Sequence, residues 1–383
     1  MKEYCFEDII KVVKREKNKK RAFLFLNLLQ GKYVPSNPIE TLQLFETLGK
    51  RVSEKYKEER ICIIGFAETA TAIAAAAASC FQQAVYFLHT TREELSNEYF
   101  ITEFEEEHSH AKQHRLYCRD KDVLQSSDVL MLIDDEFTTG KTVCNFIKKL
   151  REEHWIRAKC KVVAASLINC MKKEDMQRFA EEMIECEYLL RKDYDWKNIG
   201  WGKEIGMEKV CQIQSERQLK QAKERKSFNV IMLSGKVNPR LGIYYTEYRK
   251  ACENLTQKMI EQLQIEKEKA EDIVLLGTEE YMYPVIYAAA KIQETYPNKR
   301  CSVHATSRSP IVPMKKKDYP IYERDSIMSF YEEEREVFLY NLKKYDQVIM
   351  LTDAENITGE AKCSIEMAMD KYKNYNFKLI QWI

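Results

Sequence analysis

Acidic and hydroxyl side chains are concentrated in one short stretch of the chain, residues 134–142 (DDEFTTGKT). Asp134 and Asp135 end an apolar run, and the threonine- and glycine-containing segment behind them opens a helical pattern. A helix N-terminus presents free backbone N–H groups and a partial positive charge, so it suits a phosphate. Two carboxylates would repel that phosphate and need another partner, such as the hydroxyls of a ribose. The stretch therefore predicts a sugar-phosphate site.

Two other interpretations of the same stretch are a nucleotide-binding P-loop and a plain helix cap. Thr138, Thr139 and Thr142 add hydroxyl donors, and Gly140 lets the backbone approach a ligand closely. A nucleotide-binding P-loop would need a glycine at the position that Asp135 holds, so that interpretation fails. A plain helix cap made of Asp and Thr stays open, although it does not require an apolar strand, two carboxylates and the Thr-Thr-Gly-Lys-Thr run in this order.

Apolar runs and helical patterns alternate around this stretch. Strands are predicted at 61–65, 84–88, 128–133 and 161–168, and the intervening helices at 68–81 and 143–150. This alternation is typical of a doubly wound α/β fold with a parallel sheet. Ligands of such sheets bind at the C-terminal ends of the strands, which is where residues 134–142 would lie.

The same pattern returns after a charged segment, residues 203–228, which favours a domain boundary there. The predicted division is a first domain at 1–205, a linker at 206–228 and a second domain at 229–383. Three segments also recur in the same order: 61–78 resembles 273–290, 89–93 resembles 305–309, and 129–142 resembles 348–361. We therefore expect two tandem Rossmann-like units with parallel sheets, related by internal duplication.

Composition limits the classes of partner and compartment. The chain has 383 residues, and 61 basic residues nearly cancel 60 acidic ones, so nothing in its net charge favours a nucleic acid or a membrane surface. An RNA-binding function is disfavoured on the same ground. The 12 cysteines include no Cys-x-x-Cys pair, and no apolar run is long enough to span a membrane. Reduced thiols and a cytoplasmic location are expected.

Three histidines, His108, His110 and His114, crowd one charged segment. His110 and His114 would share a face if the segment were helical, at a spacing that also suits metal ligation. We favour His108 and His110 as contacts to substrate or pyrophosphate, with a general-base role left open. A solvated charged hairpin remains the structural alternative.

The motifs together resemble a known family. The segment at 132–142 is similar to the loop that binds phosphoribosyl pyrophosphate (PRPP) in type I phosphoribosyltransferases. With GFAETAT (65–71), LHTTRE (88–93) and EEHSHAKQH (106–114), it resembles the phosphoribosyltransferase-like proteins of bacterial tellurite-resistance and stress-response operons. Those proteins carry a second domain named for a Thr-Arg-Ser-Pro motif, which appears here at 306–310 with one serine inserted.

The resemblance implies a magnesium-dependent phosphoribosyltransferase. It assigns Asp134 and Asp135 to the ribose hydroxyls, and Arg92 to the departing pyrophosphate, with Mg²⁺ held through PRPP rather than by a protein cage. The implied loop for the 5′-phosphate consists of Glu136, Thr138, Thr139, Gly140, Lys141 and Thr142. The implied pyrophosphate turn consists of Gly65, Phe66, Ala67, Glu68 and Thr69. A carboxylate at Glu68 is explained nearly as well by the dipole of the following helix.

The second unit departs from this pattern. Asp353 is retained, but Ala354 replaces the second aspartate and Glu360 replaces the lysine of the loop. We expect that this loop no longer binds PRPP. Arg308 and Glu279 are candidates for a site in the second domain, or they maintain the fold.

Two functions from different classes remain open. The first is transfer of the phosphoribosyl group to an acceptor resembling a nitrogen base, in the synthesis or salvage of a nucleotide-like metabolite. The second is a regulator that binds PRPP or a nucleotide without turnover. Arg92, His108 and His110 favour the enzyme, because a sensor has no need of a countercharge for a leaving group. The sequence leaves homo-oligomerisation open.

Overall fold

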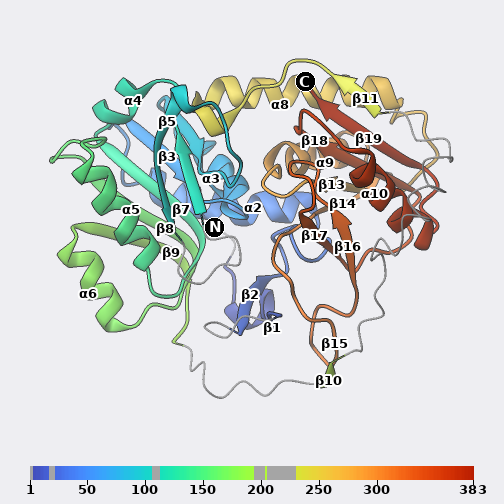
Figure 1. Cartoon of the computed structure of the whole chain (residues 1–383), viewed down its shortest axis with the longest axis horizontal. Coiled ribbons are helices and arrows are strands. Elements are labelled where there is room, and N and C mark those ends of the chain that lie inside the picture. Colours follow the sequence, from blue (N-terminus) through green and yellow to red (C-terminus); the bar gives the residue numbers. More distant parts are fainter. Residues whose placement is uncertain (1–2, 17–21, 106–112, 194–202, 205–229) are drawn as a thin grey trace. The chain divides into compact units, whose positions relative to one another are not determined.

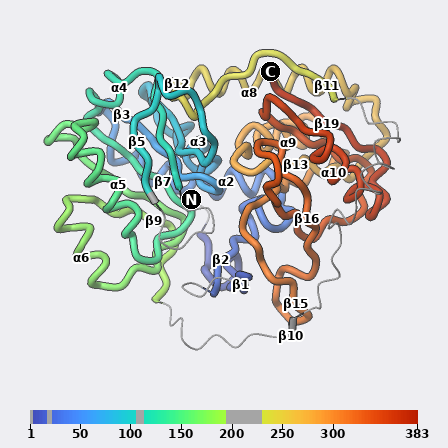
Figure 2. Tube along the Cα trace, in the orientation of Figure 1, coloured from blue at the N-terminus to red at the C-terminus, as the bar shows by residue number. Residues whose placement is uncertain are grey.

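The computed structural model describes residues 3–16, 22–105, 113–193, 203–204 and 230–383 (Figure 1). The chain divides into two compact units, neither of which is contiguous in sequence. The first consists of Met1–Ile9, Leu42–Ile199 and Val237–Lys250, and the second of Ile10–Thr41, Gly200–Lys236 and Ala251–Ile383. Each unit is an α/β structure, and Figure 2 lets the chain be followed through its segments. The predicted linker lies outside the described residues, and the predicted division at that point stays a prediction.

The first unit is built on a six-stranded sheet in the order β12-β4-β3-β7-β8-β9. Only β12 runs antiparallel to its neighbour; the other strands are parallel. The strands are β3 (Ile61–Gly65), β4 (Val85–His89), β7 (Val129–Phe137), β8 (Lys161–Asn169), β9 (Ile184–Arg191) and β12 (Ile243–Tyr244).

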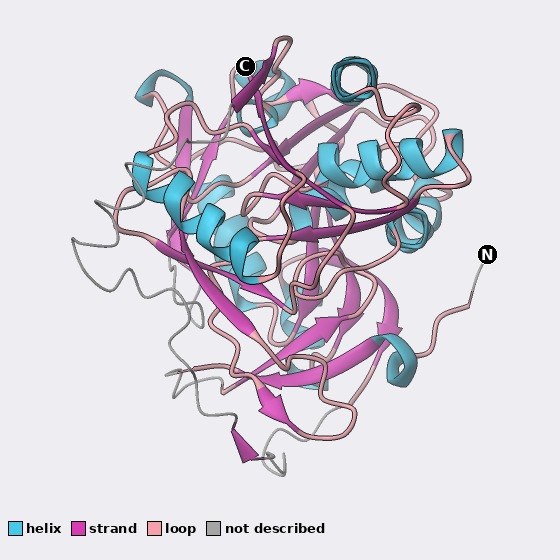
Figure 3. Cartoon of the chain, turned by 90° about the vertical axis from the view of Figure 1, so that its right-hand side faces the viewer, coloured by secondary structure: helices cyan, strands magenta, loops and turns pink. Residues whose placement is uncertain are grey.

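Helix α3 (Ala70–Ala78) packs on this sheet against β3, β4 and β7. Figure 3 shows the helices of the chain in cyan and its strands in magenta. Every residue of the alanine-rich α3 is buried, and its small side chains let it pack closely on the strands. A Cβ added at Gly65 would come within 2.7 Å of the Ala74 Cβ, so the glycine is required by this close approach. The helices of this unit are α1 (Phe6–Ile9), α3 (Ala70–Ala78), η1 (Asn97–Tyr99), α4 (Lys121–Ser126), α5 (Lys141–Glu152), α6 (Lys173–Glu181) and η3 (Pro239–Leu241).

A hairpin of β5 (Phe100–Glu105) and β6 (Gln113–Tyr117) interrupts the alternation between β4 and β7. The sequence pattern here predicted a charged stretch without a strand. Two further helices span segments of both units: α2 (Pro38–Ser53) and α8 (Tyr245–Leu263).

The second unit is built on a five-stranded, fully parallel sheet in the order β11-β19-β18-β13-β14. Its helices are α9 (Tyr283–Thr295) and α10 (Gly359–Lys371). The strands of the sheet are β11 (Val230–Leu233), β13 (Asp272–Gly277), β14 (Arg300–Ala305), β18 (Gln347–Thr352) and β19 (Phe377–Trp382).

Three two-stranded pairs complete the second unit, all antiparallel. The strand pairs are β1 (Ile10–Lys14) with β2 (Phe23–Asn27), β10 (Lys203–Glu204) with β15 (Met314–Lys315), and β16 (Arg324–Met328) with β17 (Glu336–Tyr340). Val13, Leu24 and Leu26 of the first pair share a buried cluster with Ile311 and Tyr340, from the other end of the sequence.

The two sheets share a strand order. Reading β4-β3-β7-β8 in the first and β14-β13-β18-β19 in the second, corresponding strands occupy corresponding places and all pair in parallel. Strand β3 ends on Gly65 and strand β13 ends on Gly277, and a helix follows each of them. The predicted α/β class with parallel sheets is therefore confirmed.

The cysteines within the described part of the chain are all free, and most are buried. Burial raises the pKa of the Cys80 and Cys118 thiols to about 11, which disfavours the reactive thiolate. Across the described residues, no helix has the length and apolar character to cross a membrane.

Candidate active site at the carboxyl ends of β3, β4 and β7

The acidic residues of the first loop lie within a strand. The sequence placed the end of this strand at residue 133, but β7 continues to Phe137. Asp134 pairs with Ser166 of β8, and its Oδ1 accepts a hydrogen bond from the Asp135 N–H at 2.8 Å. Asp134 and Asp135 are half-buried. The parallel ladder, rather than a flexible loop, thus fixes the backbone that carries both carboxylates.

Gly140 turns the chain from β7 into α5. Its φ of 64° is left-handed, a conformation that favours glycine. A Cβ there would come 2.3 Å from Phe179 Cε1 and 2.7 Å from Met171 Sδ, so a side chain is also excluded by packing. Gly140 is the N-cap of α5, which means that neither Asp134 nor Asp135 caps this helix. The Asp part of the plain-cap alternative is therefore wrong, whereas Thr139 Oγ1 accepts a hydrogen bond from the Lys141 N–H at 3.5 Å.

The first turn of α5 presents its backbone to the same edge of the sheet. The Cys144 N–H donates to the Gly140 carbonyl at 3.1 Å, whereas the N–H groups that precede it have no acceptor within a helix. A glycine N-cap contributes no side-chain hydrogen bond to them. Lys141 is exposed and Thr138, Thr139 and Thr142 are half-buried. This turn combines backbone donors, hydroxyls and the positive end of a helix dipole, a combination suited to an anion.

A second turn, residues 65–69, lies directly beside β7. The Phe66 N–H donates to the Ile133 carbonyl at 2.9 Å, one residue before Asp134. The peptide bond between Ala67 and Glu68 is cis. Glu68 does not begin a helix as expected, because α3 starts at Ala70 with Thr69 as its N-cap. The half-buried Glu68 carboxylate therefore belongs to the turn.

Thr90, which follows β4, joins this turn to the hairpin. Its N–H donates to the Gly65 carbonyl at 2.9 Å, and its Oγ1 accepts from the Ala67 N–H at 2.8 Å. The same hydroxyl lies 3.1 Å from His114 Nδ1. Thr90 is fully buried, so these contacts are shielded from water. Sequence reasoning did not single out Thr90, although the threonine pair at the end of an apolar strand was the available signal.

His114 lies on strand β6, so the shared helical face expected for His110 and His114 is wrong. The ring is buried and stacks on Phe104, with centroids 5.0 Å apart. Its place is structural, against Thr90 and the aromatic core. His108 and His110 lie outside the described residues. Where the structure is described, no group of three or more His, Cys, Asp or Glu side chains is arranged to hold a metal.

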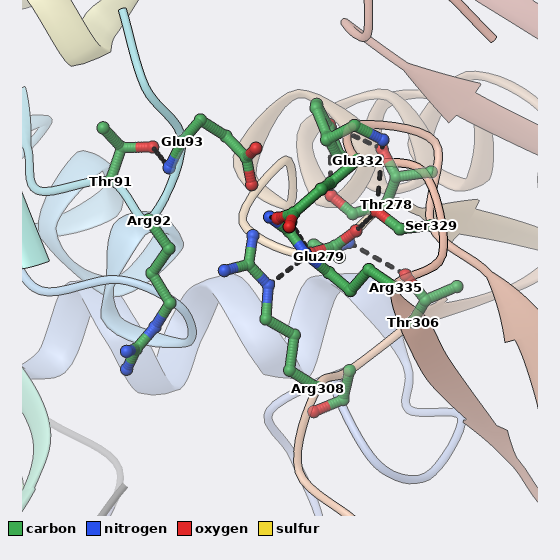
Figure 4. Close-up of polar contacts among 12 residues, drawn as sticks. Thr91, Arg92, Glu93, Thr278, Glu279, Thr306, Arg308, Ser329, Glu332 and Arg335 are labelled. Atoms are coloured by element: carbon green, nitrogen blue, oxygen red, sulfur yellow. Dashed lines mark hydrogen bonds and ion pairs between the residues drawn. The ribbon is translucent and has the colours of Figure 1, made fainter. Parts of the chain in front are cut away.

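Arg92 follows the same strand as Thr90. Thr91 and Arg115 exchange backbone hydrogen bonds at 2.9 and 2.8 Å, which pins this loop to β6. Arg115 Nη1 also donates to the Arg92 carbonyl at 3.4 Å, and the Glu93 N–H donates to Thr91 Oγ1 at 3.0 Å (Figure 4). Arg92 is half-buried and carries its charge at the carboxyl end of β4.

Neighbouring strands thus bring three groups to one edge of the sheet: the acidic pair and helix N-terminus after β7, the turn after β3, and Arg92 after β4. Parallel strands end at the same edge, which makes these groups neighbours. The carboxylates are the oxygen ligands that Mg²⁺ accepts, and a Mg²⁺ bound there would fill its remaining positions with water or substrate oxygens. The arrangement is suited to a phosphorylated sugar.

In the second unit, the two predicted candidates contact each other. Arg308 and Glu279 form an ion pair, and both side chains are largely buried. Asp353 lies at the end of β18, where its Oδ1 accepts a hydrogen bond from Tyr331 Oη at 2.6 Å.

Comparison with known protein families assigns both parts of the chain. Residues 9–191 match a family described as phosphoribosyl transferase. Residues 238–367 match the TRSP domain, described as lying C-terminal to that transferase. The two matches occur in the predicted order and together span most of the chain, so the predicted two-part architecture is confirmed. No curated protein matches the chain.

Several solved structures are similar to this chain at low sequence identity. APRTase from Giardia lamblia, complexed with 9-deazaadenine, is 13% identical with a TM-score of 0.37, and the match covers 49% of this chain and 96% of that one. Adenine phosphoribosyl transferase from Trypanosoma brucei is 13% identical with a TM-score of 0.38, over 56% and 89%. Orotate phosphoribosyltransferase from Mycobacterium tuberculosis is 9% identical with a TM-score of 0.30, over 49% and 90%.

Proposed function

Because this chain belongs to the phosphoribosyl transferase family with a C-terminal TRSP domain, we propose that it transfers the 5-phosphoribosyl group of PRPP to a nitrogen acceptor and releases pyrophosphate. One observation carries the proposal. The paired carboxylates of β7 stand directly before a glycine turn and the N-terminal end of α5, where backbone amides, threonine hydroxyls and the helix dipole are suited to an anion. A sugar phosphate matches both halves of that arrangement.

Three groups of residues bind the three parts of PRPP. The 5′-phosphate binds the amides and hydroxyls of residues 138–142, where Gly140 lets the backbone approach. Asp134 and Asp135 accept hydrogen bonds from the ribose hydroxyls, which orients C1. Pyrophosphate lies against residues 65–69, with Arg92 as its countercharge.

In the reaction, the bond from C1 to the pyrophosphate oxygen breaks and a bond from C1 to the acceptor nitrogen forms. The bonding electrons leave with pyrophosphate, and the acceptor nitrogen gives up a proton. Positive charge develops on the ribose in between, close to the carboxylates of Asp134 and Asp135, which stabilise it. His108 and His110 remain our candidates for the group that receives the proton.

We propose that Mg²⁺ accompanies PRPP. The half-buried carboxylates of Asp134 and Asp135 supply oxygen donors, while the described residues provide no complete set of protein ligands, so substrate oxygens and water would complete the coordination. When bound, the ion supplies charge neutralisation of the departing pyrophosphate.

The setting of this reaction follows from the resemblance. We propose synthesis or salvage of a nucleotide-like metabolite in the cytoplasm, in the stress-response context of the related operons. The twelve cysteines without close pairs support a reducing compartment. PRPP and a small acceptor would be the partners, with no nucleic acid or membrane involved. A homo-oligomer is compatible with this proposal and is not required by it.

We also propose that the two units arose by duplication. The shared strand order supports this, as does a repeated hydrogen bond: Thr306 N–H donates to the Gly277 carbonyl at 3.0 Å, as Thr90 N–H does to Gly65. Such a local detail is not required by the α/β class alone.

The test of the main proposal is calorimetric titration of PRPP with Mg²⁺ into wild type and the double variant Asp134→Asn/Asp135→Asn. Binding by wild type and its loss in the double variant are expected. Asp353→Asn is the matched control, because Asp353 holds the corresponding place in the second unit and should leave PRPP binding unchanged. Failure of wild type to bind would overturn the assignment of residues 134–142.

Pyrophosphate release is then measured with a panel of nucleobases and other small nitrogen acceptors. Release with any acceptor establishes the transferase reaction. PRPP binding without release across the panel would favour a regulator that binds PRPP without turnover, the second function considered from the sequence.

A further inference from the structure

The second unit repeats the backbone frame of the turn after β3. The Glu279 N–H donates to Thr306 Oγ1 at 2.9 Å, as the Ala67 N–H does to Thr90 Oγ1 in the first unit. The Ser309 N–H donates to Ser307 Oγ at 3.2 Å, which repeats the Glu93 to Thr91 bond. Through these bonds, residues 277–280 correspond to residues 65–68, and Arg308 corresponds to Arg92.

One side chain differs at the centre of this frame. Where the first unit has Ala67, the second has Glu279, whose side chain is 1% exposed. Its Oε2 pairs with Arg308 Nε and, at 3.3 Å, with Arg335 Nη1 (Figure 4). Its Oε1 accepts a hydrogen bond from Ser329 Oγ. A single carboxylate thus satisfies two arginines and a hydroxyl.

The backbone at Glu279 is unusual for a glutamate. Its φ is 49°, in the left-handed region that favours glycine. Lys32, fully buried, donates to the Glu279 carbonyl at 2.5 Å, which adds a third cation at this residue. A left-handed backbone is unfavourable for a glutamate by itself, so the charged groups around Glu279 must hold it in this conformation.

We propose that Arg308 and Arg335 form an anion site for phosphate-type groups in the TRSP domain, and that the Glu279 carboxylate is its resident occupant. The carboxylate stands where a ligand's pyrophosphate would bind in a turn of this kind. Arginine forks pair with carboxylates and phosphates in the same geometry, so one can substitute for the other. The second unit is then closed to pyrophosphate by its own side chain.

The neighbouring ribose position is filled in a similar way. Tyr331 Oη donates to Asp353 Oδ1 at 2.6 Å and lies 2.7 Å from Thr278 Oγ1. Asp353, the retained counterpart of Asp134, is 5% exposed. Internal groups of the chain therefore occupy both the position that corresponds to pyrophosphate and the position that corresponds to ribose. The anion site is inferred from the contacts of Glu279 alone. The choice of pyrophosphate as its ligand rests on the proposed function of the first unit.

The test counts binding sites for inorganic pyrophosphate on the full chain, by calorimetry with and without Mg²⁺. Glu279→Gly removes the carboxylate and suits the left-handed backbone, so this variant should bind one pyrophosphate more per chain than wild type. The double variant Glu279→Gly/Arg308→Ala should lose the added site. Glu332→Gln is the matched control: Glu332 also pairs with Arg335, but it is exposed and should leave the count unchanged.

The result that overturns the proposal is a Glu279→Gly variant with wild-type circular dichroism and no added site. If that variant does not fold, Glu279→Gln replaces it, because the amide keeps an acceptor for Ser329 and removes the charge. It should also gain a site, of lower affinity than an emptied one. The added site is counted relative to wild type. If the first unit does not bind pyrophosphate, wild type has fewer sites, but the difference between variant and wild type can still be measured.

Discussion

The turns that follow β3 and β13 share a hydrogen-bonded frame and differ in how their polar groups are satisfied. In the first unit, Ala67 leaves the turn without an acidic side chain beside Arg92 at that position. In the second, Glu279 fills the corresponding position and pairs with Arg308. The backbone of a ligand site can thus persist when its ligand is replaced by a side chain of the protein, so a shared frame alone does not establish shared binding.

The loops after β7 and β18 show the same contrast. Gly140 caps α5 without a side-chain bond, whereas Thr358 caps α10 by accepting from the Ala361 N–H at 3.1 Å. In the first unit a threonine outside the cap position, Thr139, accepts from the Lys141 N–H at 3.5 Å. The two loops therefore differ in which helix amide a threonine hydroxyl contacts.

The largest effect is expected from copying the second unit into the first. Ala67→Glu should place a carboxylate where we propose that pyrophosphate binds, and repulsion of about 3 kcal/mol would lower kcat/KM for pyrophosphate release by roughly 100-fold or more. Ala67→Gln, of the same size without charge, should lose much less. Steady-state kinetics with thermal melting separates the effect from unfolding. Near-wild-type activity of Ala67→Glu would remove the pyrophosphate turn from the proposed site.

The two loop glycines should respond differently to alanine. Gly140→Ala combines a left-handed backbone with contacts to Phe179 and Met171, so we expect about 2–4 kcal/mol of lost stability. A Cβ at Gly359 would meet nothing within 4 Å, and Gly359→Ala should change stability by less than about 1 kcal/mol. Chemical denaturation measures both, and equal effects would contradict the difference drawn between these loops.

A buried histidine should make the second unit sensitive to acid. His304 on β14 pairs with Leu276 of β13, as Leu88 on β4 pairs with Ile64 of β3. The two residues therefore hold corresponding positions. Burial lowers its pKa from 6.5 to about 4, so the unfolded chain binds a proton that the folded chain does not. Stability is then full above pH 6.5 and falls as the pH drops toward 4, by roughly 2 kcal/mol at pH 5.

Urea denaturation at pH 7 and pH 5 tests this, with His304→Leu as the matched variant because it restores the leucine of the first unit. The variant loses the hydrogen bond between Nε2 and the Tyr340 carbonyl, at 2.7 Å, and is less stable overall. Its stability should nevertheless depend less on pH than that of wild type. An identical pH slope in both proteins would assign the acid sensitivity to other groups.

The smallest effect concerns the two buried threonines of the shared frame. Thr90→Val and Thr306→Val each leave a backbone N–H without its hydroxyl acceptor, at a cost of about 1–2 kcal/mol. Stability should fall alike in both, while pyrophosphate release should fall only in Thr90→Val. Thr→Ser at either position restores the acceptor and should rescue the loss. Loss of activity in Thr306→Val would give the second unit a part in the reaction.

The sequence predicted the elements with strong hydrophobic patterns. Strand β3 was placed at its observed bounds, because a continuous apolar run identifies a buried parallel strand. The hairpin of β5 and β6 was missed, since its charged residues alternate with few apolar ones. The extension of β7 through Asp134 was missed for a related reason: the carboxylates interrupt the apolar run while the ladder with β8 continues.

The candidate site was predicted in part for physical reasons of the same kind. Residues 134–142 combine types that few structural roles require together, so they could be selected without coordinates. Thr90 acts through its backbone and one hydroxyl, and nothing in the sequence distinguishes it from Thr91. Arg308 and Glu279 were named as candidates, but their ion pair depends on the left-handed turn at Glu279, which is a property of the fold.

Each unit is built from segments that lie far apart in the sequence, and this affects how it can fold during synthesis. The β1–β2 hairpin is synthesised well before Ile311 and Tyr340, yet its apolar side chains pack with both residues. The first unit in turn lacks β12 until residues 243–244 have been translated. Neither unit can be completed by a nascent chain that stops between them, so a gene split at the interdomain boundary would encode two incomplete proteins.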